Sequence, residues 1–429
     1  MSLLSLKFSV ASGFIKGIGS QLNGISMKKQ AWLLALLIIA TLGTATALAP
    51  KSTVKPPTPP PPTTQVHWDL PQLLQESWGY YKGRFLVDGA HVVSSNYGGT
   101  ISEGQSYALM KAVWMNDPQT FRKVWGWTKT HMKRPHDHLL GWRWGDGQFG
   151  VPLGLMETDN ATDADQDIAY ALLLAGKQWN EPAYLTDGQA MIQDIWRLNV
   201  QAVEGRYYLV PGTWSGFREE YLSLDPSYMA PYVYRHFALY DKTHAAGWTQ
   251  LADDTYDTLE ACTALTTPQL PPNWCAVSWH SNQGHANQTD KPGPHIIFSD
   301  RQGEGARDFS YDAFRVYWRM LMDSKLSPSP GRERALAYLK NHPFLLTYWQ
   351  QHHRMPEGFS STGQPLSQET SGFGLGPVLV LNHVKHPELD GALYQQTLGK
   401  HYNPDGYWFN DYNDFMHSVI WLHLYAMSL

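Results

Sequence analysis

The sequence from residue 66 to residue 429 predicts an all-α domain, an (α/α)6 toroid with six inner helices inside six outer ones. Segments whose apolar residues recur at helical spacing follow one another, separated by loops rich in Gly and Pro. Strand-like alternation is rare, and the helices come in pairs, as in stacked αα-hairpins. The predicted helices span 69–83, 103–116, 118–132, 163–179, 182–196, 227–241, 246–261, 312–323, 331–341, 369–383, 388–399 and 413–427.

Length and charge narrow the class of protein. The chain has 429 residues, which is long for one domain but within the range of helical toroids. Without residues 1–49, which hold four Lys and no acid, 29 basic residues face 38 acidic ones and the net charge is about −9. This acidity argues against a nucleic-acid partner and suits a neutral substrate. The 18 Trp and 23 Tyr fit either a large core or a cleft whose rings stack on sugars.

The N-terminal segment has the pattern of an export signal followed by a spacer. A basic start at Met27, an apolar run over 31–40 and Ala-x-Ala sites up to Ala49 predict a secretory signal within residues 1–49, with Met27 as a candidate true start. If it is not cleaved, its ~19 apolar residues form a membrane anchor. Residues 50–65 are Pro-rich and predict a semi-rigid linker. We therefore expect the helical domain to lie outside the cytoplasm, either in the periplasm or secreted. It would contact the membrane only through this N-terminal segment.

Cys262 and Cys275 enclose a short Pro-rich loop. In an exported protein a disulfide between them would contribute roughly 3 kcal/mol, and two free thiols are the alternative. The surrounding polar segment 261–308 has three open interpretations: a lid, a wall of a binding site or a surface contact. His131, His136 and His138 lack metal-ligand spacing, so no metal is expected.

A stretch that begins polar and becomes apolar organises the middle of the chain. Asn160, Thr162 and Asp163 stand where an N-cap belongs, and carboxylates crowd the first turn that follows. Simple capping is one explanation of these acids. The apolar face that continues the helix consists of Ile168, Ala171, Leu172, Ala175 and Trp179.

Residues 161–179 resemble the signature of the family 8 glycoside hydrolases. That signature reads Ala-(Ser/Thr)-Asp-(Ala/Gly)-Asp, two variable positions, (Ile/Met)-Ala and a Trp further on, and every fixed position is met here. The resemblance extends over most of residues 66–429. It implies the (α/α)6 fold and hydrolysis of glycosidic bonds without a metal or other cofactor. It also implies that Asp163 hydrogen-bonds the sugar at the cleaved position.

Glu103 follows a Gly-rich loop and lies in the first turn of a predicted helix, which Ser102 is expected to cap. An ordinary acidic helix start is the alternative explanation. The string Ser-Glu-Gly-Gln-Ser-Tyr over 102–107 resembles the segment that holds the general acid in family 8. This resemblance assigns the role of acid to Glu103.

Asp312 precedes another apolar helix, in the string Tyr-Asp-Ala-x-x-Arg. This pattern resembles the general-base segment of the family and assigns that role to Asp312. Arg315, three residues on, is expected to share its helix face and to hold Asp312 ionised. A surface charge is the alternative role of Arg315.

In a toroid whose inner helices point the same way, Glu103, Asp163 and Asp312 would meet at one rim. A helix N-terminus favours an ionised carboxylate by ~0.3–1 kcal/mol, which helps a base and opposes an acid. Glu103 therefore needs burial and the nearby charge of Asp163 to stay protonated. The expected reaction inverts the anomeric configuration, with a carboxyl separation of roughly 6.5–9.5 Å that leaves room for one water.

Aromatic residues near these acids are candidates for sugar contact. Trp142, in preference to Trp144, lies where the family places a stacking Trp, and Tyr221 and Tyr311 are further candidates. Core packing is the alternative for each ring.

The resemblance implies an inverting endo-β-1,4-glucanase acting on a cellulose-type β-1,4-glucan chain. An export signal followed by a tether resembles the arrangement in family members that accompany bacterial cellulose synthase. The cellulose synthase and export machinery is therefore an expected partner. A family 8 xylanase, lichenase or chitosanase is the nearest alternative. A non-catalytic glycan-binding accessory protein and a polysaccharide lyase on a similar toroid are alternatives of other classes.

Overall fold

The computed structural model describes residues 68–94, 97–148, 151–215, 221–279, 295–299 and 303–429. All of them belong to one compact unit, Gln65–Leu429, and a separate unit comprises Met1–Thr64. The predicted signal or anchor and the whole predicted linker, residues 1–65, lie outside the described residues. In the ranges that are described, no helix is both long and apolar enough to cross a membrane.

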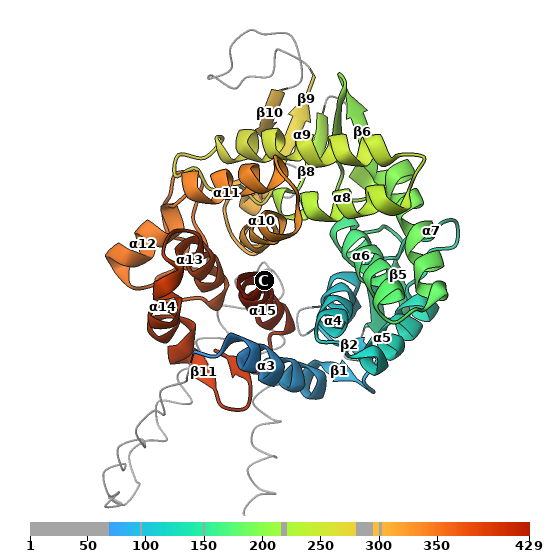
Figure 1. Ribbon diagram of the computed structural model, residues 1–429, viewed down its shortest axis with the longest axis horizontal. Helices are drawn as coiled ribbons and strands as arrows, with labels where there is room; N and C mark the ends of the chain where they lie inside the picture. Colours follow the sequence, from blue (N-terminus) through green and yellow to red (C-terminus); the bar gives the residue numbers. More distant parts are fainter. Residues whose placement is uncertain (1–67, 95–96, 149–150, 216–220, 280–294, 300–302) are drawn as a thin grey trace, which may run out of the picture. The chain divides into compact units, whose positions relative to one another are not determined.

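Helices of the unit Gln65–Leu429 form two concentric rings, which confirms the predicted all-α toroid (Figure 1). Each inner helix packs against the next, and the last returns to the first. The inner helices are α4 (Ser102–Trp114), α6 (Thr162–Gln178), α8 (Pro231–Tyr240), α10 (Arg315–Leu326), α13 (Gly372–Lys385) and α15 (Asp414–Ser428). Around them lie α3 (Leu70–Phe85), α5 (Pro118–His131), α7 (Pro182–Asn199), α9 (Ala245–Thr263), α11 (Gly331–Asn341), α12 (Phe344–His352) and α14 (Asp390–Gln396).

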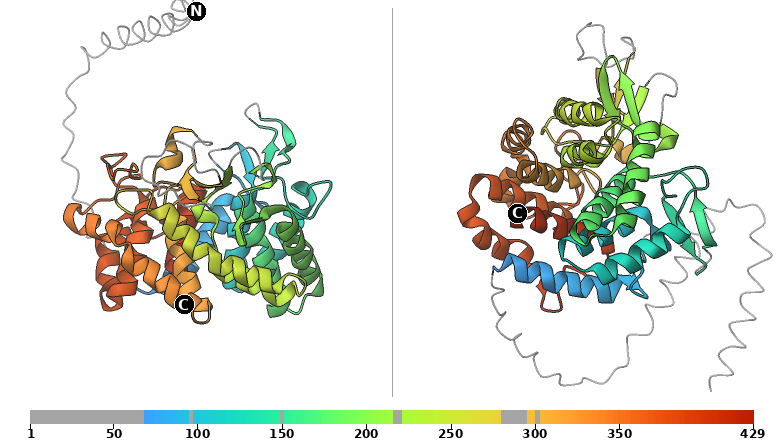
Figure 2. Two further views of the ribbon diagram at one scale, coloured as in Figure 1. Left: turned by 90° about the horizontal axis from the view of Figure 1, so that it is seen from above. Right: turned by 45° about the vertical axis from the view of Figure 1, so that its right-hand side comes forward.

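Burial separates the two rings. Nearly every side chain of α4 and α6 is buried, because an inner helix is covered by its inner neighbours and by the outer ring. The outer helix α5 buries only one stripe, at the helical spacing of Phe121, Val124, Trp125 and Thr128. Figure 2 shows loops and short strands on one side of the helical layer and the C-terminus on the other.

Several predicted helix ends shift in the structure. Residues 227–241 divide into a 3-10 turn, η2 (Pro226–Tyr228), and α8, which begins at Pro231 because proline suits the first helical position. The prediction also lacked α12. Outer helices α3 and α5 begin as expected from sequence, since Asp69 and Asp117 accept hydrogen bonds from backbone N–H groups of their first turns.

The predicted caps of α4 and α6 are wrong. Ser102 is the first residue of α4 and does not cap it, and the N-cap positions are Ile101 and Ala161, without side-chain caps. The buried hydroxyls of Ser102 and Thr162 have no hydrogen-bond partner among the described residues, and other polar side chains at this rim bind groups outside the helix ends. Asn160, for example, accepts from the Thr213 backbone N–H at 2.8 Å and donates to Asp165 at 2.9 Å.

The start of α10 also differs from the prediction. The helix begins at Arg315, so Asp312 lies in the turn before it and not in its first turn. Asn273 holds this turn: its Oδ1 accepts from the Ser310 and Ala313 backbone N–H groups at 3.1 and 3.2 Å. Its Nδ2 donates to Ser310 Oγ at 2.7 Å. A side chain distant in sequence thus replaces the helix as the support of Asp312.

Two three-stranded antiparallel sheets flank the rim. One contains β3 (Gly99–Ile101), β4 (Arg143–Asp146) and β5 (Leu153–Glu157), and β3 runs directly into α4. The other contains β8 (Tyr221–Leu224), β9 (Cys275–Ser278) and β10 (His295–Phe298). Smaller hairpins pair β1 (Leu86–Val87) with β2 (His91–Val92), β6 (Val200–Val203) with β7 (Arg206–Leu209) and β11 (Tyr402–Asn403) with β12 (Tyr407–Trp408).

A disulfide joins Cys262, at the end of α9, to Cys275, at the start of β9. It closes the base of the loop that carries Asn273 and Trp274. The described part of segment 261–308 therefore supports the turn of Asp312 and, through Trp274, forms a wall of the cavity described below.

Candidate active site

A cavity of about 450 Å³ lies where the inner helices α4 and α6 begin. Charged and aromatic side chains dominate its lining. The charged residues are Glu103, Asp159, Asp163, Asp312 and Arg315, and the aromatic residues are Tyr97, Trp142, Trp214, Tyr228 and Trp274. The three carboxylates assigned from sequence therefore share one cavity.

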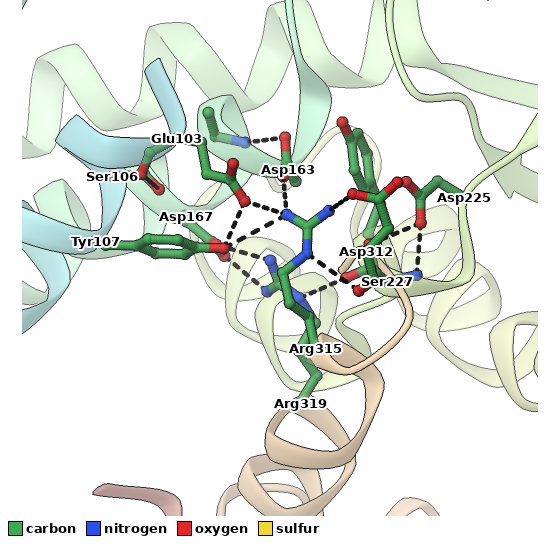
Figure 3. Close-up of polar contacts among 12 residues, drawn as sticks. Glu103, Ser106, Tyr107, Asp163, Asp167, Asp225, Ser227, Asp312, Arg315 and Arg319 are labelled. Carbon is green, nitrogen blue, oxygen red and sulfur yellow. Dashed lines mark hydrogen bonds and ion pairs between the residues drawn. The ribbon is translucent and has the colours of Figure 1, made fainter. Parts of the chain in front are cut away.

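Arg315 joins these three carboxylates (Figure 3). Its Nη1 donates to Glu103 Oε1 and, at 2.6 Å, to Asp163 Oδ2, while its Nη2 donates to Asp312 Oδ1 at 3.1 Å. Two oxygens bound to neighbouring nitrogens of one guanidinium are at most about 8 Å apart. Glu103 and Asp312 thus face the same space. The upper limit on the distance between their bound oxygens is compatible with the ~6.5–9.5 Å carboxyl separation of inverting enzymes.

Glu103 lies in the first turn of α4, and 20% of its side chain is exposed. Burial raises the pKa of its carboxyl to about 7, and the charge of Asp163 acts in the same direction, although Arg315 and the Tyr107 hydroxyl lower it. Tyr107 Oη donates to Glu103 Oε1 at 2.7 Å. Burial therefore outweighs the helix end and the arginine, as a general acid near neutral pH requires.

Asp312 remains 38% exposed and accepts hydrogen bonds from Arg315 and the Trp274 indole, both of which lower its pKa. Burial has the larger effect and leaves the pKa of Asp312 above its ordinary value. The predicted contact with Arg315 is present, and Arg315 lowers the pKa of Asp312 in the expected direction, although burial has the larger effect. That Arg315 holds Asp312 ionised stays a prediction.

Asp163 is almost fully buried in the first turn of α6, with 4% of its side chain exposed. Its Oδ1 accepts from the Ala164 backbone N–H at 2.8 Å and its Oδ2 accepts from Arg315. These two hydrogen bonds fix the orientation of the Asp163 carboxylate in the cavity.

A second polar layer lies beneath the cavity. Arg319, one turn beyond Arg315 on α10, binds Asp167 through two hydrogen bonds of 2.9 and 2.8 Å, and both residues are buried. Its Nε also donates to the Ser227 carbonyl at 2.7 Å. This pair ties α10 to α6 and to η2. Such a buried, two-armed ion pair holds the three segments in register under the carboxylates.

Asp165 supports the same rim from α6. It is buried, and burial raises the pKa of its carboxyl to about 7, while hydrogen bonds from Asn160 and the Leu140 backbone N–H lower it. Through Asn160, which accepts from the Thr213 backbone N–H, it positions the turn that carries Trp214. The second Asp of the sequence motif thus acts on the shape of the cavity.

The aromatic predictions have different outcomes. Trp142 lines the cavity and packs edge-to-face on Tyr97 with ring centroids 5.6 Å apart. Trp144 instead packs edge-to-face on Trp127 at 5.0 Å and is not part of the lining. Regular strand alternation would place residues 142 and 144 on one face, but Trp142 precedes β4 and the β4–β5 register shifts between Arg143 and Trp144.

Tyr311 and Tyr221 do not line the cavity. Tyr311 is 44% exposed and packs edge-to-face on Phe373 at 5.1 Å, and Tyr221 pairs with Ser278 in the β8–β9 ladder. Their predicted sugar contacts stay predictions for the surface outside the cavity.

Sequence reasoning did not single out four of the lining aromatics: Tyr97, Trp214, Tyr228 and Trp274. Trp274 lies in the segment without an assigned role, and Trp214 follows no recognisable pattern. The only available signal was the high overall content of Trp and Tyr. Within the described ranges, no group of three or more His, Cys, Asp or Glu has the arrangement of a metal site.

Comparison with known proteins places this site in context. The model of the family described as glycosyl hydrolases family 8 matches residues 66–379. An endoglucanase of Cellulomonas uda is 32% identical over 204 residues, which cover 47% of this chain and 55% of that protein. An endoglucanase of Pseudomonas fluorescens (strain SBW25) is 34% identical over 262 residues, which cover 58% of this chain and 61% of that protein. The chain thus matches less than two thirds of the length of these curated relatives.

Among solved structures, the endo-beta-1,4-glucanase CMCax from Acetobacter xylinum superposes with a TM-score of 0.63 at 22% identity. The superposition covers 83% of this chain and 98% of that chain. At this identity the likeness shows the fold.

Proposed function

The chain belongs to glycosyl hydrolases family 8, and on that premise we propose that it is an inverting endo-β-1,4-glucanase acting on cellulose-type β-glucan. The observation that carries the proposal is the group of three carboxylates from distant parts of the chain around one guanidinium, inside one cavity. Endoglucanases among its relatives support the choice of polymer.

In this reaction Glu103 is the general acid. Its Oε1 already accepts from Tyr107 and Arg315, so the proton is expected on Oε2, from which it passes to the departing glycosidic oxygen. The raised pKa keeps this proton in place up to about neutral pH. A carboxyl group with an ordinary pKa has lost its proton at that pH and cannot protonate the leaving group.

Asp312 is the general base on the other side of the scissile bond. It takes a proton from a water that attacks the anomeric carbon from the face opposite the leaving group. Asp163 accepts a hydrogen bond from the sugar at the cleaved position and helps to hold its ring distorted. Arg315 keeps the three carboxyl groups in place although they repel one another.

The aromatic lining supports a sugar polymer as substrate. Rings such as Trp142, Trp214 and Trp274 present flat apolar faces that stack on the apolar faces of glucose units. The mildly acidic composition suits a neutral chain better than an anionic one. Export to the periplasm or the exterior, and work beside cellulose synthesis, belong to the same proposal and rest on the signal-like and Pro-rich pattern of residues 27–65.

Reducing-end release from carboxymethylcellulose tests the proposal, with the product anomer resolved by NMR. We expect α-anomeric products from β-linked substrate, and a loss of at least ~10²-fold in kcat for both Glu103→Gln and Asp312→Asn. Glu181→Gln is the matched control, because Glu181 precedes the outer helix α7 and is exposed.

Parallel assays on xylan, mixed-linkage glucan and chitosan identify the polymer. Products that absorb near the ultraviolet edge would indicate a lyase instead. Binding of cellulose oligomers with no product from any polymer would indicate a glycan-binding accessory protein. Cell fractionation reports whether the chain is exported and whether it stays at the membrane.

A further inference from the structure

A fourth carboxyl group lies behind the general base. Asp225 stands between β8 and η2, is only 2% exposed, and is not part of the cavity lining that includes Asp312. In Figure 3 the carboxyl groups of Asp225 and Asp312 point toward one another. The mechanism proposed above does not use Asp225.

The two oxygens of Asp225 have different surroundings. Oδ1 accepts from the Ser227 backbone N–H at 2.8 Å and from Ser227 Oγ at 2.7 Å. Oδ2 is buried, and none of the described residues donates a hydrogen bond to it. A buried anionic oxygen without a donor is strongly unfavourable. A proton on Oδ2 removes this problem, because it turns the oxygen into a donor and leaves Oδ1 as the acceptor for Ser227.

The charges around Asp225 favour the same state. Burial and the negative charge of Asp312 raise the pKa of Asp225 well above its ordinary value, and Arg315 and Ser227 lower it. Arg315 is shared among Glu103, Asp163 and Asp312. Two further titratable side chains near this turn do not offset this: Arg319, which donates to the Ser227 carbonyl, is bound to Asp167, and burial raises the pKa of the Tyr228 hydroxyl.

We propose that Asp225 is a positioning residue for the general base, held neutral at working pH, with its Oδ2 proton donated toward the Asp312 carboxylate. The inference rests on the proposed function, since it assigns Asp225 a task only if Asp312 is the base. A donor to the charged form of Asp312 favours that form and fixes the orientation of its carboxylate. An ionised Asp225 would do the opposite, because two like charges at one site keep one of them protonated.

The Asn variant is an unusually direct test, because Ser227 determines its orientation. The two donors of Ser227 hold an amide oxygen at the Oδ1 position, which places the Asn amide nitrogen at the Oδ2 position. Asp225→Asn therefore keeps a neutral donor facing Asp312. Asp225→Ala removes the donor. Circular dichroism and melting curves show whether each variant is folded.

The measurement is kcat/KM on carboxymethylcellulose from pH 3 to pH 9, at about 0.5-unit steps. For Asp225→Asn we expect activity within about threefold of wild type and an unchanged acidic limb. For Asp225→Ala we expect a loss of roughly tenfold or more, and an acidic limb moved up by about one pH unit. An acidic limb that moves down in the Asn variant would show that Asp225 is ionised and would overturn the inference. A wild-type profile in the Ala variant, or an Asn variant as impaired as Ala, would overturn it as well.

A second readout does not depend on activity. In protein labelled with ¹³C at the Asp carboxyl groups, the resonance lost in Asp225→Asn is expected to stay in the range of a protonated carboxyl at pH 7. A lost resonance in the carboxylate range would overturn the inference even in an active enzyme. Failure of the proposed function looks different: Asp312→Asn would keep its activity, or no glucan would be cleaved, whatever the state of Asp225.

Discussion

Glu103→Gln is expected to destroy activity and, above neutral pH, to stabilise the protein. The raised pKa of Glu103 means that the folded state holds a proton which the unfolded chain has already released at the same pH. Between the ordinary value of 4.5 and the folded value of about 7, folding must take up this proton, so wild-type stability falls as pH rises. Glutamine has no such proton, and Arg315 keeps two acidic partners without Glu103.

The magnitude follows from the size of the pKa shift. A change from 4.5 to about 7 corresponds to at most about 3 kcal/mol of pH-dependent stability. The coupling to Asp163 and Asp312 and the 20% exposure of the side chain make this an upper bound. The stability difference between variant and wild type should thus grow by up to about 3 kcal/mol from pH 4.5 to pH 8, with no growth below pH 4.5.

Urea denaturation at fixed pH values over this interval measures the difference. Glu181→Gln, which removes an exposed carboxylate before an outer helix, is expected to follow the wild-type curve. If wild type and Glu103→Gln run parallel from pH 4.5 to pH 8, Glu103 has an ordinary pKa and the assignment of the acid loses its electrostatic basis.

Three further predictions concern pH dependence and stability. The kcat/KM profile should be bell-shaped, with a basic limb near pH 7 from loss of the Glu103 proton and an acidic limb above the ordinary range of an Asp; a flat profile up to pH 9 would contradict it. Cys275→Ser, which frees Cys262, should lower the free energy of unfolding by about 2–4 kcal/mol, and reductant should destabilise the wild type equally. Arg319→Met should cost about 3–5 kcal/mol by leaving Asp167 buried and unpaired. The double variant Arg319→Met/Asp167→Leu should recover at least half of that loss in the same urea assay, and no recovery would argue against the ion pair.

The all-α fold class and the candidate acids could be predicted from the sequence because both depend on local patterns. Apolar spacing in segments such as 163–179 and 413–427 marked inner helices, whose observed bounds differ by one residue at each end. Six-residue strings were enough to single out Glu103 and Asp312 by resemblance, and the longer signature over 161–179 singled out Asp163. Trp142 could be found by its place before the motif, whereas Tyr311 and Tyr221 are not part of the cavity lining.

What the linear chain could not reveal is how these residues share charge and hydrogen bonds. Arg315 lies 212 positions from Glu103 and 152 from Asp163, and only closure of the helical ring brings its guanidinium to both. Asn273 replaces helix α10 as the support of Asp312, and Asp225 reaches the base from the opposite side, by contacts that no local pattern encodes. The sequence by itself determined which groups are candidates for the chemistry and which segments are helical. The tertiary structure decided their protonation, because burial and a shared counter-ion depend on the distances between segments and not on their order.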